Sequence, residues 1–199
     1  MANQSAIHAV GNQLIRYLHD TYPESLSGDG FSCDFRLFSS KELTDTDNLS
    51  TTLSLFLYRM TVNEYLRNAR PEQSLRNRVM PLSLDLHYLL TVWADSAQQE
   101  QTILAWAVRQ LYLNPILDMS ALASDAWDAE DVVQVVPAEL SHEDMMRVWD
   151  ALEPSYRLSF PYVARAVRLD LDTAADSLPV VDTRLDFETH EPRREDAGI

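Results

Sequence analysis

The chain has 199 residues, 46% of them hydrophobic and 9% aromatic, which excludes a wholly disordered chain and allows one sizeable core. Its 16 basic and 31 acidic residues give a net charge of −15, which repels phosphate backbones and anionic lipid head groups. The sequence has no uncharged apolar run of membrane-spanning length and no signal-peptide pattern. We therefore expect a soluble protein made in the cytoplasm, with neither nucleic acid nor membrane as a partner.

The first third of the chain alternates between helical and strand patterns. Apolar residues recur at helical spacing over residues 3–20 and predict an amphipathic helix, which a loop at 21–30 should end. Residues 31–38 alternate with a period of two, which predicts a half-buried strand with Cys33 on its apolar face. This single cysteine excludes an intrachain disulfide, and we interpret it as a small core residue rather than a nucleophile.

Two strands joined by a long loop follow a polar turn region at 39–48. Residues 52–65 predict a strand covered on both faces, with Leu53, Leu55 and Leu57 on one face and Phe56, Tyr58, Met60 and Val62 on the other. Residues 67–81 are rich in Arg and Asn and should project as a loop. Residues 82–94 predict the next strand, expected to pair antiparallel with its predecessor.

The second half of the domain contains two predicted helices with clear start signals. Ser96 is followed by Gln99, and Ser141 by Asp144, in the spacing of capping boxes, and Pro115 should stop the first of these helices. The connection between the helices is acidic, with a short strand at 132–136.

The last predicted strand covers residues 156–171 and should lie at a sheet edge, because Pro161 cannot donate to a strand ladder. We therefore expect one domain over residues 1–172 and an acidic tail over 173–199. The composition of the tail favours disorder, although its runs LPVV and RLDF could add as a strand to a neighbour.

Motifs for catalysis, cofactors and metals are missing from the sequence. The five histidines have no metal-ligand spacing, and the four glycines cannot form a phosphate-binding loop. The acidic residues between 118 and 131 lack the glycine and ligand spacing of a calcium loop. We therefore expect no cofactor, no metal and no enzymatic activity; a hydrolase that uses an acid pair is the weakest alternative.

Charge is distributed unevenly along the chain. Residues 67–78 contain Arg67, Arg70, Arg76 and Arg78 against Glu72, a net +3, whereas residues 118–153 contain ten acids and one arginine, a net −9. Opposite patches on one surface suit a head-to-tail contact between identical subunits, which can close into a ring. Two unrelated solvated surfaces would give the same distribution.

Five sequence blocks resemble one known family. They are SLFLYRMTVNEYLRN (54–68), PLSLDLHYLLTVWA (81–94), EQTILAWAVRQLYLNPIL (100–117), LSHEDMMRVWDAL (140–152) and YRLSFPYVARAVRLD (156–170). They resemble the tail-terminator, or cap, proteins of extracellular contractile injection systems, which are phage-tail-like particles. The resemblance covers residues 3–172 in order and without large gaps.

The resemblance implies an α+β fold, with a mixed, largely antiparallel sheet flanked by helices, as in phage tail terminators. It also implies a hexameric ring of copies of the chain on the distal end of the inner tube and sheath, where it stops polymerisation within a particle that is assembled in the cytoplasm and can be released. The alternative is an assembly chaperone for tube or sheath subunits.

Exposed sheet edges and aromatic-plus-arginine surfaces are plausible contacts for such a cap. We predict contacts with partners or other subunits at Tyr58, Asn63, Tyr65, Arg67, Asn68, Arg70, Arg76, Arg78, Tyr156, Arg157, Tyr162 and Arg165. The competing interpretation is that the tyrosines are ordinary residues of an amphipathic sheet.

Overall fold

A computed structural model of the chain describes residues 5–28, 30–44, 49–63, 82–117, 132–152 and 155–169. Its helices are α1 (Ala6–Thr21), α2 (Glu24–Gly28), α3 (Ser40–Thr44), α5 (Ala97–Leu113) and α6 (His142–Asp150). Its strands are β1 (Asp34–Phe38), β2 (Thr52–Val62), β3 (Leu82–Trp93), β4 (Ile116–Leu117), β5 (Val133–Pro137) and β6 (Ser159–Leu169).

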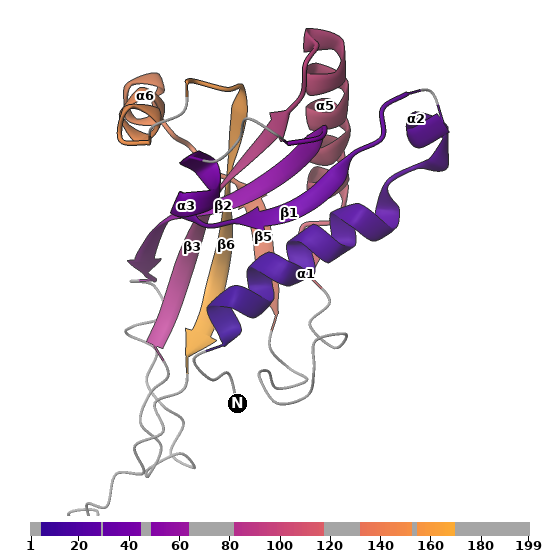
Figure 1. The fold of residues 1–199 in the computed structure, drawn as a ribbon. Helices are drawn as coiled ribbons and strands as arrows, with labels where there is room; N and C mark the ends of the chain where they lie inside the picture. The colour runs from indigo at the N-terminus through magenta and orange to yellow at the C-terminus, as the bar shows by residue number, and fades with distance from the viewer. Residues whose placement is uncertain are drawn as a thin grey trace, which may run out of the picture.

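The six strands form one sheet in the order β1-β2-β3-β6-β5-β4 (Figure 1). Strands β1 and β2 pair in parallel, and all other neighbours pair antiparallel, including β2 with β3 as the sequence predicts. The expected fold class, a mixed and largely antiparallel sheet flanked by helices, is therefore confirmed.

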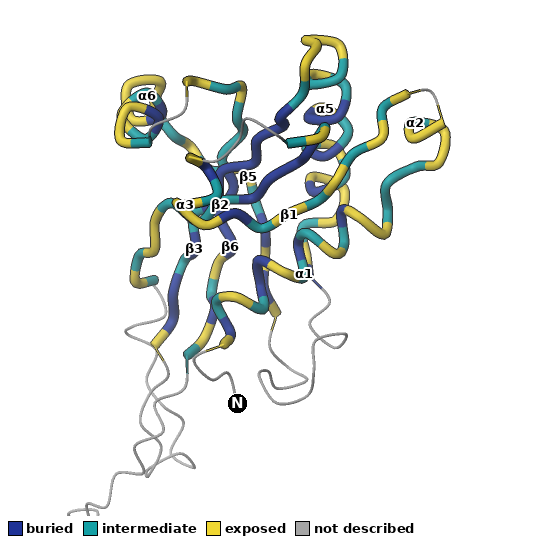
Figure 2. Tube along the Cα trace, in the orientation of Figure 1, coloured by how far each residue is buried: buried dark blue, intermediate teal, exposed yellow. Residues whose placement is uncertain are grey.

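Helices cover both faces of the sheet and create two separate cores. Helices α1 and α5 pack on one face, where Leu14 and Ile103 meet buried leucines and valines of the central strands. On the other face, Leu43 of α3 and Trp149 of α6 pack against Trp93 and its neighbours. Figure 2 shows the central strands buried between these layers. Double coverage explains why β2 and β3 read as near-continuous apolar runs.

The two helix starts predicted from capping signals are confirmed. The Ser96 hydroxyl accepts a hydrogen bond from the Gln99 backbone N–H at 3.2 Å, and α5 ends at Leu113, before Pro115. Ser141 accepts from the Asp144 backbone N–H at 3.1 Å at the start of α6. Each cap satisfies a backbone donor that the first helical turn leaves without a partner.

Two predicted loops contain short helices. Helix α2 lies within 21–30, and α3 lies within 39–48. At α3, the Glu42 carboxylate accepts hydrogen bonds from the backbone N–H and hydroxyl of Ser39, both at 2.8 Å. This is the return half of a capping box, a signal that the polar composition of the segment conceals.

The edge position predicted for the last strand is wrong, because β6 lies between β3 and β5. The Pro161 carbonyl accepts from the Ala138 N–H at 3.0 Å, so it faces the β5 side. The nitrogen and carbonyl of one residue point to the same side of an antiparallel strand. The proline nitrogen therefore also faces the β5 side, where β5 has already ended at Pro137, so the missing donor falls at the end of this ladder.

Candidate interface at the end of the sheet

Three strands continue past the rest of the sheet at one end. Strand β1 ends at Phe38, opposite Phe56, whereas β2 continues to Val62 beside β3. Strand β5 leaves β6 after Arg165, whereas β6 continues to Leu169, opposite Leu82. We call this part, β2 from Leu57, β3 up to His87 and β6 from Ala164, the wing. Within the described residues, its β2 edge has no neighbouring strand.

A bulge in β2 decides which side chains face which way. The register shifts at Tyr58, between the pairs Leu57–Tyr88 and Arg59–His87. Met60 then pairs with Leu86 and Val62 with Leu84, on the α1 face. The prediction that Met60 and Val62 share a face with Phe56 and Tyr58 is therefore wrong, because an extra residue reverses the alternation.

The α1 face of the wing carries apolar side chains that the helix does not cover. The side chains of Met60 and Val62 are 54% and 46% exposed, and Leu82 is also exposed. Large exposed apolar residues that gather on one surface are typical of contact sites. Sequence reasoning missed this patch because the bulge has no signature in the alternation pattern.

The opposite face of the wing is polar. Arg59 lies opposite His87, and Thr61 lies opposite Asp85. The Thr61 hydroxyl lies 3.0 Å from Nε2 of His87, and the Tyr58 ring meets the His87 ring edge-on at 6.1 Å. Burial lowers the pKa of His87, and the Arg59 cation lowers it further. The imidazole is therefore held mostly neutral at pH 7.

A second bulge, in β6, is held by a carboxylate. Ala166 has a φ of 63°, in the left-handed region that costs energy for any residue with a Cβ. Its backbone N–H donates to Oδ1 of Asp85 at 3.1 Å, and the Asn63 side-chain amide donates to the same oxygen at 3.0 Å. Asp85 thus ties the ends of β2 and β6 to β3.

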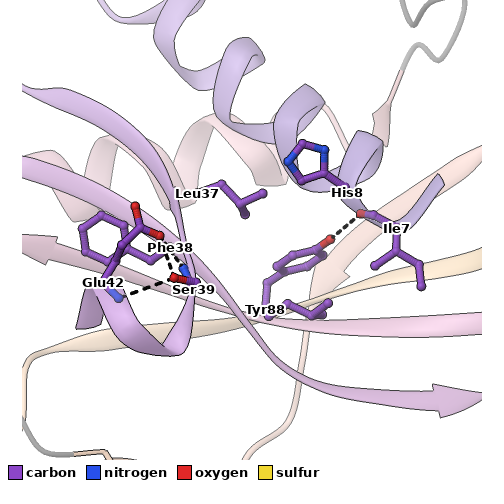
Figure 3. A pocket seen from close by; sticks show the side chains of 8 residues that line it. Ile7, His8, Leu37, Phe38, Ser39, Glu42 and Tyr88 are labelled. Atoms are coloured by element: carbon purple, nitrogen blue, oxygen red, sulfur yellow. Dashed lines mark hydrogen bonds between the residues drawn. The ribbon is translucent and has the colours of Figure 1, made fainter. Parts of the chain in front are cut away.

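A groove of about 430 Å³ begins where β1 ends (Figure 3). Its walls are mostly apolar and come from α1, β1, β2 and β3, and the polar residues Ser39 and Glu42 lie toward the start of α3. The Tyr88 hydroxyl points to the carbonyl oxygen of Ile7, 3.5 Å away, and His8 lies above the opening. Leu57, the first residue of β2 beyond the end of β1, lines this groove. The groove therefore adjoins the part of the β2 edge that has no described neighbour.

The structure separates the predicted contact residues into groups. Tyr58, Asn63 and Arg165 lie together on the wing, and Arg165 is exposed. Tyr156 and Arg157 lie at the opposite end of β3: Tyr156 is 51% exposed and meets Trp149 edge-on, and Arg157 stacks over Trp93.

Tyr162 lies in the core, fully buried. Its hydroxyl donates to the Val108 carbonyl at 3.1 Å, and burial raises its pKa to about 12. Its side chain therefore joins α5 to the sheet.

The remaining predicted contact residues lie outside the described residues: Tyr65, Arg67, Asn68, Arg70, Arg76 and Arg78. The acidic stretch 118–131 also lies outside them. Residues 118–153, with ten acids and one arginine, form what we call the acidic patch. Its described part includes α6, where Glu143 and Asp144 are exposed and pair with Arg147.

Neither a metal-ligand cluster nor a membrane-spanning helix is found in the described ranges. No group of three or more His, Cys, Asp or Glu side chains there could hold a metal ion. Among the described helices, none is long and apolar enough to cross a membrane.

Comparisons with known proteins give one family and one fold. The family model of the Pvc16 N-terminal domain matches residues 9–183, beyond residue 172 where the sequence predicts the domain to end. No curated protein matches the chain.

Two solved structures share the fold. The PVC sheath/tube terminator of an extracellular contractile injection system, in its extended state, has a TM-score of 0.59 at 22% identity, with 96% of this chain and 66% of that chain covered. The tube-terminating cap of the anti-feeding prophage has a TM-score of 0.58 at 20% identity, with 89% and 60% covered. The chain thus spans somewhat less than two thirds of those proteins.

Proposed function

Because the chain belongs to the Pvc16 N-terminal domain family, we propose that it is a structural cap that ends the inner tube and sheath of a contractile injection system. The observation that carries this proposal is the likeness over 96% of the chain to a protein described as a sheath/tube terminator. A second protein of the same fold is described as a tube-terminating cap.

The physical task of a cap needs recognition rather than chemistry. A stacking polymer exposes a reactive surface at its end, and a ring that is complementary on one face only stops growth there. The wing offers suitable contacts: a strand edge without a described neighbour, exposed apolar residues on one face and a polar face with Arg59 and Arg165. We propose that the protein is not an enzyme and needs no cofactor.

The proposed partners are other copies of the chain, in a ring expected to be a hexamer, and the tube and sheath proteins. Tyr58, Asn63 and Arg165 on the wing, and Tyr156 and Arg157 at the other end of β3, are the described candidates for these contacts. Their positions at two ends of the sheet would allow one set to face the polymer and the other a neighbouring subunit.

Deletion of the gene tests the cap function directly. Electron microscopy of particles from the deletion strain should show tubes and sheaths of uncontrolled length or unstable sheaths, and the intact gene on a plasmid should restore them. Particles of normal length and stability in the deletion strain would contradict the proposal. Mass spectrometry of purified wild-type particles separates a cap, which stays in the particle, from a chaperone, which leaves.

The head-to-tail contact has its own test. Arg76→Glu with Arg78→Glu reverses charge in the arginine-rich loop that we propose meets the acidic patch of the next subunit. Size-exclusion chromatography with light scattering should show loss of the oligomer. Arg193→Glu with Arg194→Glu makes the same charge change in the tail and should leave the oligomer intact. Equal assembly of both double variants would rule out this contact.

A further inference from the structure

We propose that residues 181–187 of one copy pair as an added strand with the free β2 edge of a neighbouring copy, over Leu57–Val62. This inference rests on the proposed ring. It identifies one contact that would join adjacent subunits and assigns a role to a segment outside the described residues.

The β2 edge has the hydrogen-bonding groups for an added strand. Beyond Phe56, β2 pairs with β3 on one side only within the described part of the chain. Earlier along β2, the backbone groups on its other side pair with β1. Beyond Phe56 the corresponding N–H and C=O groups are available to pair with another strand. Strand addition satisfies such groups without demanding a particular sequence.

The two faces beside this edge select what kind of strand can bind. On the α1 face lie the apolar groove with Leu37, Leu57 and Tyr88, and then the exposed Met60 and Val62. On the other face Arg59 is exposed, and no carboxylate of the described residues forms an ion pair with it. The edge therefore suits a strand with apolar side chains on one face and acidic side chains on the other.

The C-terminal segment has this pattern. Val181, Thr183, Leu185 and Phe187 alternate with Asp182, Arg184 and Asp186. In a strand, the first set would face the groove and Met60, and the second set would face Arg59, where two carboxylates outnumber one arginine. One orientation of the added strand thus places its apolar side chains on the apolar face of the edge and its acidic side chains on the face with Arg59.

The path of the chain favours a neighbouring copy over the same copy. Strand β6 ends at Leu169, at the end of the sheet where β2 also ends. The connection of residues 64–81 leaves β2 from this end, so a tail that returned to its own β2 would have to cross that connection. Eleven residues separate Leu169 from Val181 and can span about 36 Å when extended, enough to reach an adjacent subunit.

Disulfide formation between two full-length variants tests the contact. Both carry Cys33→Ala; one carries Thr61→Cys, and the other carries Asp182→Cys, Arg184→Cys or Asp186→Cys in turn. After mixing and mild oxidation, we expect a disulfide-linked pair of chains at one tail position, several-fold above the others. Arg109→Cys on the exposed face of α5, in place of Thr61→Cys, is the matched control and should give none.

Charge reversal gives a second, independent measurement. Arg59→Asp should raise the dissociation constant of the oligomer at least tenfold, and adding Asp182→Arg and Asp186→Arg should restore it. Leu185→Pro should weaken the oligomer as strongly, whereas Ala197→Pro should not, because only the first removes a donor within the added strand.

The outcomes separate this contact from the ring itself. A ring that forms without crosslinking above the Arg109→Cys control would overturn the added strand and leave the cap function standing. A further variant that combines Thr61→Cys with the tail cysteine in one chain would overturn it equally if its disulfide formed only within that chain. Absence of any oligomer in the wild-type protein would overturn the ring as well.

Discussion

Ala166 shows how one side chain can hold an unfavourable backbone. Its φ of 63° persists because the Asp85 carboxylate accepts the Ala166 N–H, 3.1 Å away. Ala166→Gly removes the clash of Cβ with the backbone, and we expect the free energy of unfolding to rise by about 0.5–1 kcal/mol despite the greater freedom of glycine in the unfolded chain. Urea denaturation measures this change.

Ala164 provides the matched control two residues earlier in β6. It is fully buried and lacks a positive φ, so Ala164→Gly should destabilise the protein by about 1 kcal/mol. Equal destabilisation by both glycine variants would show that the left-handed conformation of Ala166 is not strained.

Cys33 should make the protein sensitive to alkali. Burial raises the pKa of its thiol from 9.0 to about 12, so the unfolded chain loses this proton at a lower pH than the folded protein. The thiol therefore does not reduce the stability of the folded protein below pH 9, and it reduces that stability increasingly as the pH rises from 9 toward 12. Between pH 8 and pH 10 we expect ionisation of this thiol alone to lower the unfolding free energy by up to about 1.4 kcal/mol.

Cys33→Ala separates the thiol from the tyrosines. Tyrosine ionises near pH 10.0 in an unfolded chain, only one pH unit above the thiol, and burial also raises the pKa of Tyr22, Tyr88 and Tyr162. The tyrosines therefore contribute to the same decline, and the alanine variant should lose less stability than the wild type between pH 8 and 9.5 in urea melts. The same decline in both proteins would assign the effect to other groups.

At the scale of elements, the sequence predicts those features of helices and strands that depend on residues close together in the chain. Ser96 and Ser141 mark helix starts because capping is local, and the apolar residues on both faces of the segment 52–65 predict that both faces of β2 are covered. Neither the bulge at Tyr58 nor the interior position of β6 could be predicted, since each depends on the partner strand. The exposure of Met60 and Val62 and the structural role of Asp85 at the β6 bulge were missed for the same reason.

Gly11 sets how closely α1 approaches the sheet. A Cβ at this position would lie 2.9 Å from both methyl carbons of Leu37 in β1. We expect Gly11→Val to lower the unfolding free energy by about 1–3 kcal/mol, because Leu37 or the helix must move. Chemical denaturation measures the loss. Gly28→Val is the control, since nothing lies within 4 Å of a Cβ there, and similar losses would contradict a packing role.

At the scale of the whole molecule, the arrangement separates stability from recognition. Two cores on opposite faces of the sheet hold the centre, while the β2 edge of the wing extends past β1 and leaves Met60 and Val62 exposed. Substitutions at Arg59 or Met60 should therefore affect assembly more than folding. Because of this separation, the proposed ring and the fold can be tested independently.

The amount of protein per particle distinguishes a cap from any factor that acts on individual subunits. A ring binds only at the end of a polymer, so its copy number should stay constant while the number of tube and sheath subunits grows with length. Quantitative mass spectrometry of particles fractionated by length should give the same number of copies in each fraction. A copy number proportional to length would indicate binding along the polymer, and a vanishing one would indicate a factor that leaves before the particle matures.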